Sequence, residues 1–298
     1  MMRLVSDDER ARGKPTGLQR VKQAARRLRL GWLVDKVVSP ILDPVADAAN
    51  RATTVAKKTP VGQDIRGGHH ALSYLRHLAR GNRLKRRTFY ESVNETHPPV
   101  LLIHGFLGTR GSMWPLEQRL AQEGIVVFSF NLGTFNSRDI RTSAFLIHRK
   151  IEAILAQTNV KKIDIIGHSM GGLIGLYYVK KLGGAAKVRK LVMMGTPARG
   201  TWVALAGVAT LGLWSASSWQ LLPRSRFLRE LEQGPLPPEV QYYTLAADRD
   251  WVCPPASTTV PGATPIRVAL GHSSLVVSEE VFQHIVDALR APVPAPEP

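Results

Sequence analysis

From residue 96 onward, short apolar runs alternate with segments of helical periodicity. The apolar runs cover residues 100–103, 125–130, 163–166, 188–194, 240–246 and 266–270. Helical periodicity covers residues 139–157, 171–182 and 277–289. Strands separated by helices pair in parallel through right-handed crossovers, and the helices then cover both faces of the sheet. The sequence therefore predicts an α/β fold with a mostly parallel sheet flanked by helices.

The charge of the chain is concentrated in its first third. The formal net charge is +17, and the first 90 residues hold 20 basic and 7 acidic side chains. We therefore predict a basic, largely helical N-terminal extension over residues 1–95 and an α/β domain over 96–290. The proline-rich segment 291–298, APVPAPEP, is predicted to be a disordered tail.

Residues 18–38 form a basic amphipathic pattern within the extension. Apolar side chains from Leu18 to Trp32 fall at spacings of three and four, with arginines and lysines between them. This pattern is typical of a helix on an anionic membrane surface, although the apolar stripe could instead pack onto the α/β domain. No recognisable nucleic-acid module accompanies the charge, and we expect no nucleic-acid partner.

A second unusual segment, residues 201–223, is apolar and uncharged. A single membrane span here would place the flanking strands of one sheet on opposite sides of the membrane, so we treat a span as the minor alternative. We predict instead an apolar helical cap, at about 199–238, over a binding cleft.

Ser169 lies in the sequence Gly-His-Ser-Met-Gly, between an apolar run and a helical pattern. A serine on a tight turn between strand and helix is exposed at the carboxyl edge of a sheet, and flanking glycines avoid clashes there. A serine hydroxyl is a poor nucleophile by itself and requires a base. Ser169 is the predicted nucleophile.

Two backbone amides could stabilise an oxyanion beside this serine. His104-Gly105-Phe106 follows the first apolar run directly, and Met170 follows the serine. We predict that the amides of Phe106 and Met170 form an oxyanion hole, in which each donor lowers the barrier by about 3 kcal/mol.

The base is expected on a loop after the last strand, where His272 lies. An acid must orient this histidine, and the loop after residues 240–246 offers Asp248 and Asp250. We favour Asp250, because an aspartate nearer the strand end more often caps a turn. The order Ser169, Asp250, His272 is the nucleophile, acid and base order of the α/β-hydrolase fold.

The motifs HGFLG, GHSMGG, GTPARG, DWVCPP and GHSSL together resemble the bacterial lipase and esterase branch of the α/β-hydrolases, which includes triacylglycerol lipases. The resemblance covers residues 97–290. It implies hydrolysis of lipid-like carboxylic esters through an acyl-enzyme, with a lid after Gly200. Within this lid, the predicted substrate-binding residues are Trp202, Leu205, Leu211 and Trp214.

The chain departs from the secreted calcium-dependent lipases of this branch. GHSSLVV offers no acid after the histidine, and Cys253 is the only cysteine, so no intrachain disulfide forms. We expect no metal and no cofactor. No secretory signal is apparent, and we expect a cytoplasmic protein or one peripheral to the cytoplasmic face of a membrane.

Alternative functions use the same triad. An acyltransferase would pass the acyl group to an alcohol, and a phospholipase or thioesterase would differ in leaving group. A non-catalytic membrane-associated scaffold is a minor alternative, since a scaffold would not need all three residues.

Overall fold

The computed structural model describes residues 64–78, 93–94, 98–133, 136–205, 208 and 215–292. The chain divides into two compact units, Met1–Val61 and Gly62–Pro298. The predicted surface helix at 18–38, the candidate residues Leu211 and Trp214, and most of the predicted tail lie outside the described residues. The fold and site below belong to the second unit.

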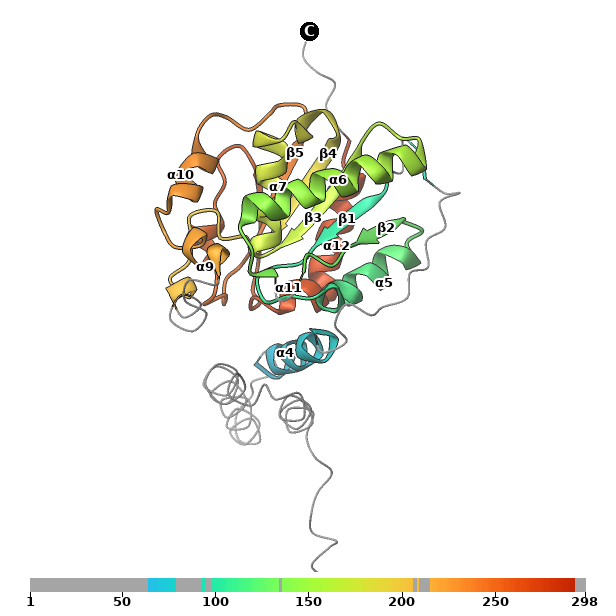
Figure 1. Cartoon of the computed structure of the whole chain (residues 1–298). Coiled ribbons are helices and arrows are strands. Elements are labelled where there is room, and N and C mark those ends of the chain that lie inside the picture. The colour runs from blue at the N-terminus through green and yellow to red at the C-terminus, as the bar shows by residue number, and fades with distance from the viewer. Residues whose placement is uncertain are drawn as a thin grey trace, which may run out of the picture. The chain divides into compact units, whose positions relative to one another are not determined.

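A six-stranded sheet with the order β2-β1-β3-β4-β5-β6 forms the centre of this unit (Figure 1). Every neighbouring pair of strands is parallel, which confirms the predicted fold class. The strands are β1 (Val100–Ile103), β2 (Val127–Ser129), β3 (Ile163–His168), β4 (Val188–Met194), β5 (Gln241–Ala247) and β6 (Thr264–Val268).

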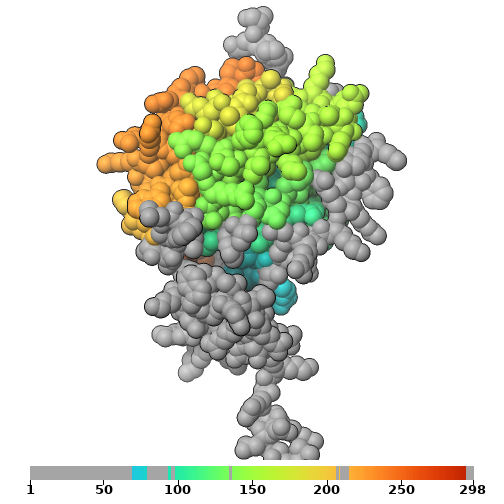
Figure 2. Space-filling view, in the orientation of Figure 1, coloured from blue at the N-terminus to red at the C-terminus, as the bar shows by residue number. Residues whose placement is uncertain are grey.

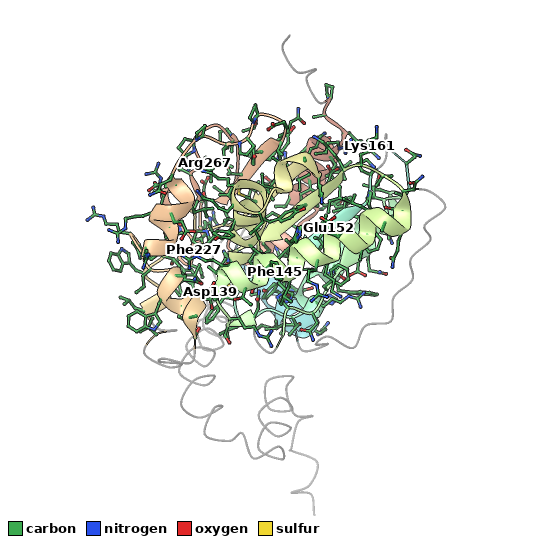
Figure 3. The ribbon with its side chains drawn as sticks, turned by 45° about the horizontal axis from the view of Figure 1, so that its top comes forward. Asp139, Phe145, Glu152, Lys161, Phe227 and Arg267 are labelled. Atoms are coloured by element: carbon green, nitrogen blue, oxygen red, sulfur yellow. The ribbon has the colours of Figure 1, made fainter. Side chains whose placement is uncertain are left out.

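Helices join the strands and cover the sheet. The α-helices are α4 (Asp64–Leu78), α5 (Trp114–Gln122), α6 (Ile140–Thr158), α7 (Met170–Lys181), α9 (Ala216–Gln220), α10 (Arg226–Glu232), α11 (Ser274–Val277) and α12 (Glu279–Arg290). Short 3₁₀ helices are η3 (Arg110–Met113), η5 (Gly184–Ala186) and η7 (Pro255–Thr258). Helices α6 and α7 cover the face seen in Figure 2, and Asp139, Phe145 and Glu152 follow one another along α6 in Figure 3.

Two apolar layers sandwich the sheet, because successive side chains of each strand point to opposite faces. In β1, Leu101 and Ile103 join a core with α6 and α7, whereas Val100 and Leu102 join a core with α5, α11 and α12. This double burial explains why the inner strands are continuous apolar runs instead of alternating ones.

The observed strands differ from the predicted runs by a few residues at their ends. Strand β6 differs most in the position of its two ends: it spans Thr264–Val268 instead of residues 266–270. Its first residues are exposed at the sheet edge, so they carry no apolar signal. Helix α5 was not predicted.

Helix α4 falls inside the predicted extension of residues 1–95, yet it packs against η3 and α11 of the sheet domain. The boundary at residue 95 stays a prediction. Among the residues that the structure describes, no helix is both long and apolar enough to cross a membrane.

Lys190 in β4 is fully buried beneath the end of α12. Its Nζ donates to the carbonyls of Ala288 and Leu289, each at 2.8 Å, and to that of Ala291. Burial, followed by the charge of Arg189, lowers the pKa of Lys190 to about 8. The side chain supplies donors to carbonyls that a helix C-terminus leaves unpaired.

Replacing Lys190 with Met is expected to lower the free energy of unfolding by about 3 kcal/mol, because carbonyls of α12 lose their donor. Lys187, which pairs with Glu152 at the surface, provides the control. Lys187→Met should cost less than about 1 kcal/mol. Urea unfolding measures both variants, and equal costs would contradict this role for Lys190.

Candidate active site

Ser169 is the single residue between β3 and α7. Its backbone has φ 55° and ψ −126°, a conformation that side-chain-bearing residues rarely adopt and that costs about 1 to 3 kcal/mol. The amide of Ser169 donates to the carbonyl of Met194 at 2.8 Å, which fixes the turn to the end of β4. The structure therefore places Ser169 on the strained strand-to-helix turn that the sequence predicts.

The first turn of α7 passes very close to the end of β1. A Cβ atom added at Gly171 would lie 2.2 Å from the carbonyl oxygen of Ile103. Only a glycine allows this approach, which brings the positive N-terminal end of α7 beside Ser169.

His272 and Asp250 form a hydrogen-bonded pair. His272 Nδ1 lies 2.6 Å from Asp250 Oδ2, and the other carboxylate oxygen accepts from the amides of Val252 and Cys253, at 2.9 and 2.7 Å. The carboxylate is buried and held on both oxygens. Its rival, Asp248, instead accepts from Arg267 at the surface. Of the two candidate acids, the structure brings Asp250 to His272.

Several contacts bring this pair to the serine turn. The ring of His168, which precedes Ser169, lies 4.7 Å from the His272 ring, centroid to centroid. A Cβ atom added at Gly195, next to Met194, would lie 3.0 Å from His272 Nδ1. The three predicted catalytic residues therefore meet at the carboxyl edge of the sheet.

Cys253 also lies in this cluster, and sequence reasoning counted it without placing it. Its thiol interacts with the side chain of Ser169, and its sulfur lies within 4.8 Å of donor atoms of Asp250 and His272. Burial, reinforced by the charge of Asp250, raises the pKa of the thiol well above its usual value. The thiol is therefore protonated at neutral pH.

These three donors do not fit a metal ion as they stand. Two ligands on a tetrahedral zinc lie about 3.3 Å apart, whereas Asp250 Oδ2 and His272 Nδ1 are 2.6 Å apart. The arrangement is that of a hydrogen-bonded dyad beside a thiol.

The loop after β1 lies against Ser169. A Cβ atom added at Gly105 would be 2.8 Å from the Cβ of Ser169. Within the described residues, the amides of Phe106 and Met170 donate to no backbone carbonyl outside regular helices and strands. They belong to the residues that directly follow Gly105 and Ser169 in the chain, and they stay the predicted donors of the oxyanion hole.

Asn136 holds this loop, and sequence reasoning missed it. Its side chain is fully buried, and Nδ2 donates to the carbonyls of His104 and Gly105, at 3.1 and 3.2 Å. Its positive φ of 44° is a conformation in which asparagine is enriched. The only sequence signal is an asparagine in the connection between β2 and α6, which is weak evidence for a role.

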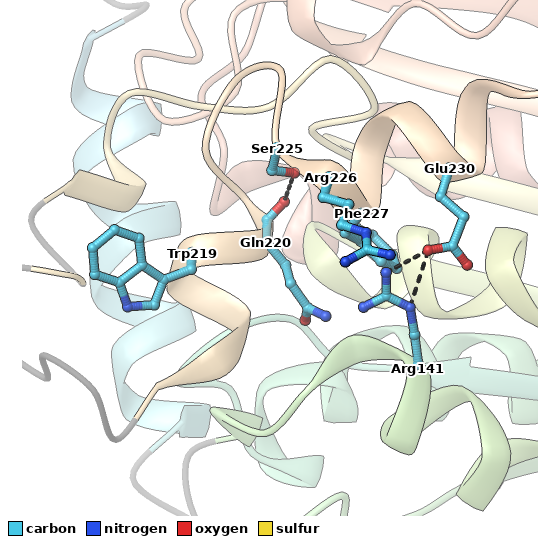
Figure 4. Close-up of a pocket in the computed structure, with 7 residues that line it drawn as sticks. All are labelled: Arg141, Trp219, Gln220, Ser225, Arg226, Phe227 and Glu230. Carbon is cyan, nitrogen blue, oxygen red and sulfur yellow. Dashed lines mark hydrogen bonds and ion pairs between the residues drawn. The ribbon is translucent and has the colours of Figure 1, made fainter.

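A pocket of about 480 Å³ lies where the predicted cap meets α6 (Figure 4). Its polar side chains are mostly engaged in joining the two: Arg141 pairs with Glu230, and Gln220 donates to Asp139 at 2.7 Å. Arg141 also lies over the ring of Phe227, at 5.2 Å from its centroid. None of the candidate catalytic residues lines this pocket. We interpret it as the joint that fixes α9 and α10 to the sheet domain.

The predicted substrate-binding residues that the structure describes are exposed. Trp202 is 71% exposed and Leu205 is 48% exposed. Both follow the carboxyl end of β4, on the same edge as Ser169.

Comparison with known proteins agrees with this architecture. A family model described as the alpha/beta hydrolase fold matches residues 98–214. The structure resembles that of a Bacillus licheniformis lipase in propeptide form, with a TM-score of 0.59 and 17% identity over 69% of this chain and 53% of that one. It also resembles Aspergillus fumigatus lipase B, with a TM-score of 0.60 and 17% identity over 73% of this chain and 57% of that one. The chain has the α/β-hydrolase fold.

Parts of the chain are also similar in sequence to bacterial triacylglycerol lipases and cutinases. The chain is 32% identical over 87 residues to a triacylglycerol lipase of Vibrio cholerae, covering 28% of this chain and 27% of that protein. It is 31% identical over 115 residues to a triacylglycerol lipase of Pseudarthrobacter phenanthrenivorans (36% and 35%), and 29% identical over 91 residues to cutinase 2 of Thermobifida cellulosilytica (28% and 35%). The matches thus span about a third or less of the length of these relatives.

The close approach at Gly171 provides a test of the serine turn. Gly171→Ala is expected to lower the free energy of unfolding by about 3 kcal/mol, because the new methyl group meets backbone atoms of Ile103 that cannot move aside. Gly183, which has φ 75° and nothing within 4 Å of an added Cβ, serves as control. Gly183→Ala should cost only about 1 kcal/mol. Urea unfolding compares the two, and a Gly171 variant as stable as the control would refute the tight turn.

Proposed function

We propose that this protein is a serine ester hydrolase of the lipase, esterase or cutinase kind. The observation that carries the proposal is the 2.6 Å contact between His272 Nδ1 and Asp250 Oδ2 beside the strained turn of Ser169. The homologous lipases and cutinases support the same reaction class.

The proposed chemistry begins at the Ser169 hydroxyl. Asp250 accepts a hydrogen bond from Nδ1–H of His272, and this tautomer leaves Nε2 as the atom with a free lone pair. Nε2 takes the serine proton while Oγ attacks the ester carbonyl carbon. The amides of Phe106 and Met170 stabilise the resulting oxyanion. His272 then protonates the leaving alcohol, and an acyl-enzyme remains.

Water completes the cycle by the same route. His272 removes a proton from water, the hydroxide attacks the acyl carbon, and the serine oxygen leaves with the proton from the histidine. The buried carboxylate of Asp250 stabilises the imidazolium in both steps. Its two hydrogen bonds from the amides of Val252 and Cys253 prevent the carboxylate from turning away.

A lipid-like substrate is supported by the apolar surface around the site. Large exposed apolar side chains lie on three segments that follow strand ends: Leu107 after β1, Trp202 and Leu205 after β4, and Trp251 after β5. Exposed apolar groups gathered at one edge commonly mark a binding surface. We propose that acyl chains of the substrate contact these side chains.

Substitutions of the triad test the reaction. Ser169→Ala and Asp250→Asn should each lower kcat/KM on p-nitrophenyl esters by at least about 1000-fold, because the nucleophile or the oriented tautomer is lost. Asp248→Asn is the matched control and should retain native activity, since Asp248 pairs only with Arg267 among the described contacts. A fully active Ser169→Ala protein would overturn the proposal.

Leu107, Trp202, Leu205 and Trp251 together form what we call the apolar rim. Its role in acyl-chain binding predicts that activity depends on the length of the acyl chain. The double variant Trp202→Ser, Trp251→Ser should lose about tenfold in kcat/KM on long-chain esters, because it removes apolar contact area. Activity on p-nitrophenyl acetate should change little. Phe145→Ser removes another exposed aromatic ring, on α6 and 54% exposed, and should affect neither substrate. Equal losses on both substrates would exclude the rim from acyl-chain binding.

A further inference from the structure

Helix α4 contacts both loops that carry the proposed catalytic groups. It packs against η3, which begins just after the loop 104–109, and against α11, which begins two residues after His272 (Figure 1). These loops follow β1 and β6 and are far apart in sequence. One helix from before the sheet therefore bridges the predicted oxyanion loop and the predicted base loop.

The contact with the oxyanion loop is made at its far end. Thr109 Oγ1 donates to the carbonyl of Leu78, the last residue of α4, at 3.0 Å. The last carbonyls of a helix have no partner within it, so this bond satisfies one of them. Asn136 holds the start of the loop through His104 and Gly105, and α4 holds its end. The Phe106 amide lies between these two attachments.

The contact with the base runs through two rings. Tyr74 of α4 meets His168 edge-on, with ring centroids 5.9 Å apart and planes at 60°. His168 in turn lies against His272, at 4.7 Å and 41°. Tyr74 also interacts with the side chain of Ser112 in η3. Tyr74 thus touches the supports of both loops.

His168 is also bonded to the base loop directly. Its Nε2 lies 3.3 Å from the backbone carbonyl of His272, and a carbonyl can only accept, so Nε2 carries the proton. Burial, followed by the charge of His272, lowers the pKa of His168 well below its usual value. His168 is therefore a neutral donor, and its ring supports the imidazole of His272 without adding a competing positive charge.

We propose that α4 is a positioning element of the active site, in which Tyr74 and His168 are positioning residues that hold His272 and the Phe106 loop in place. The inference rests on the ester hydrolysis proposed above. Helix α4 is then required for turnover. A displacement of α4 would lower activity while leaving the sheet folded.

Kinetics of the full chain test the role of Tyr74. Tyr74→Ala should lower kcat on a p-nitrophenyl ester by about tenfold or more, because small misplacements of catalytic groups slow the chemical step. KM should stay within about twofold, since the substitution removes none of the side chains of the proposed acyl-binding rim. Tyr74→Phe keeps the ring and should remain near native activity. Leu72→Ala, at a position of α4 that is 57% exposed, is the control and should behave as native protein.

A second pair of variants tests the bond from His168. His168→Leu removes the donor to the carbonyl of His272 and should lower kcat, whereas His168→Gln retains an N–H donor and should recover part of the loss. A role in packing alone predicts the reverse order, because leucine is the better apolar replacement.

Hydrogen–deuterium exchange supplies a readout that does not depend on activity. In Tyr74→Ala, peptides covering 104–113 and 271–277 should exchange faster than in native protein, while β4 peptides keep native protection. Where Tyr74→Ala fails to fold, Tyr74→Leu retains apolar volume and takes its place. Native kcat together with native exchange in both loops would overturn the role of α4. A native protein without esterase activity would instead overturn the proposed function, and exchange would still decide whether α4 holds the loops.

Discussion

The close contact between the first turn of α7 and the end of β1 determines the geometry of the whole site. It requires the absence of a side chain at Gly171 and forces Ser169 into its strained backbone conformation. Because the predicted oxyanion loop starts directly after Ile103, the same contact also brings Gly105 against Ser169. The conformational cost of this turn is about 1 to 3 kcal/mol, which the apolar layers on both faces of the sheet offset.

Two buried polar side chains around this turn, Asp250 and Asn136, are held by specific partners. Asp250 is fixed by two backbone amides and by His272, and Asn136 is fixed by the loop that it supports. Such partners matter because a buried polar group without one costs about 1 to 3 kcal/mol. The site is therefore rigid at the acid and at the loop after β1. Our proposal for α4 extends this to the base, because His168 donates to the backbone carbonyl of His272 and its ring lies against the His272 ring.

Much of the fold could be predicted from the sequence. All six strands were predicted, because residues buried on both faces give continuous apolar runs. The elements that were missed are those without such a signal. Helix α5 is short and begins with Trp114-Pro115, and the exposed start of β6 at Thr264 resembles a loop. The functions of Asn136 and Tyr74 could not be predicted, because both depend on contacts with residues distant in sequence.

The sequence by itself determined the order of strands and helices along the chain and the order Ser169, Asp250, His272, since local periodicity and turn glycines are encoded by neighbouring residues. Tertiary structure decided which aspartate reaches the histidine, where Cys253 lies, and which helix supports the base. Strand order and register set these contacts. Strands β1, β3, β4 and β5 are successive neighbours in the sheet, and this arrangement brings the loops that follow them to one edge. Asp248 and Asp250 lie only two residues apart after β5. The sequence therefore does not reveal which of the two side chains points toward His272.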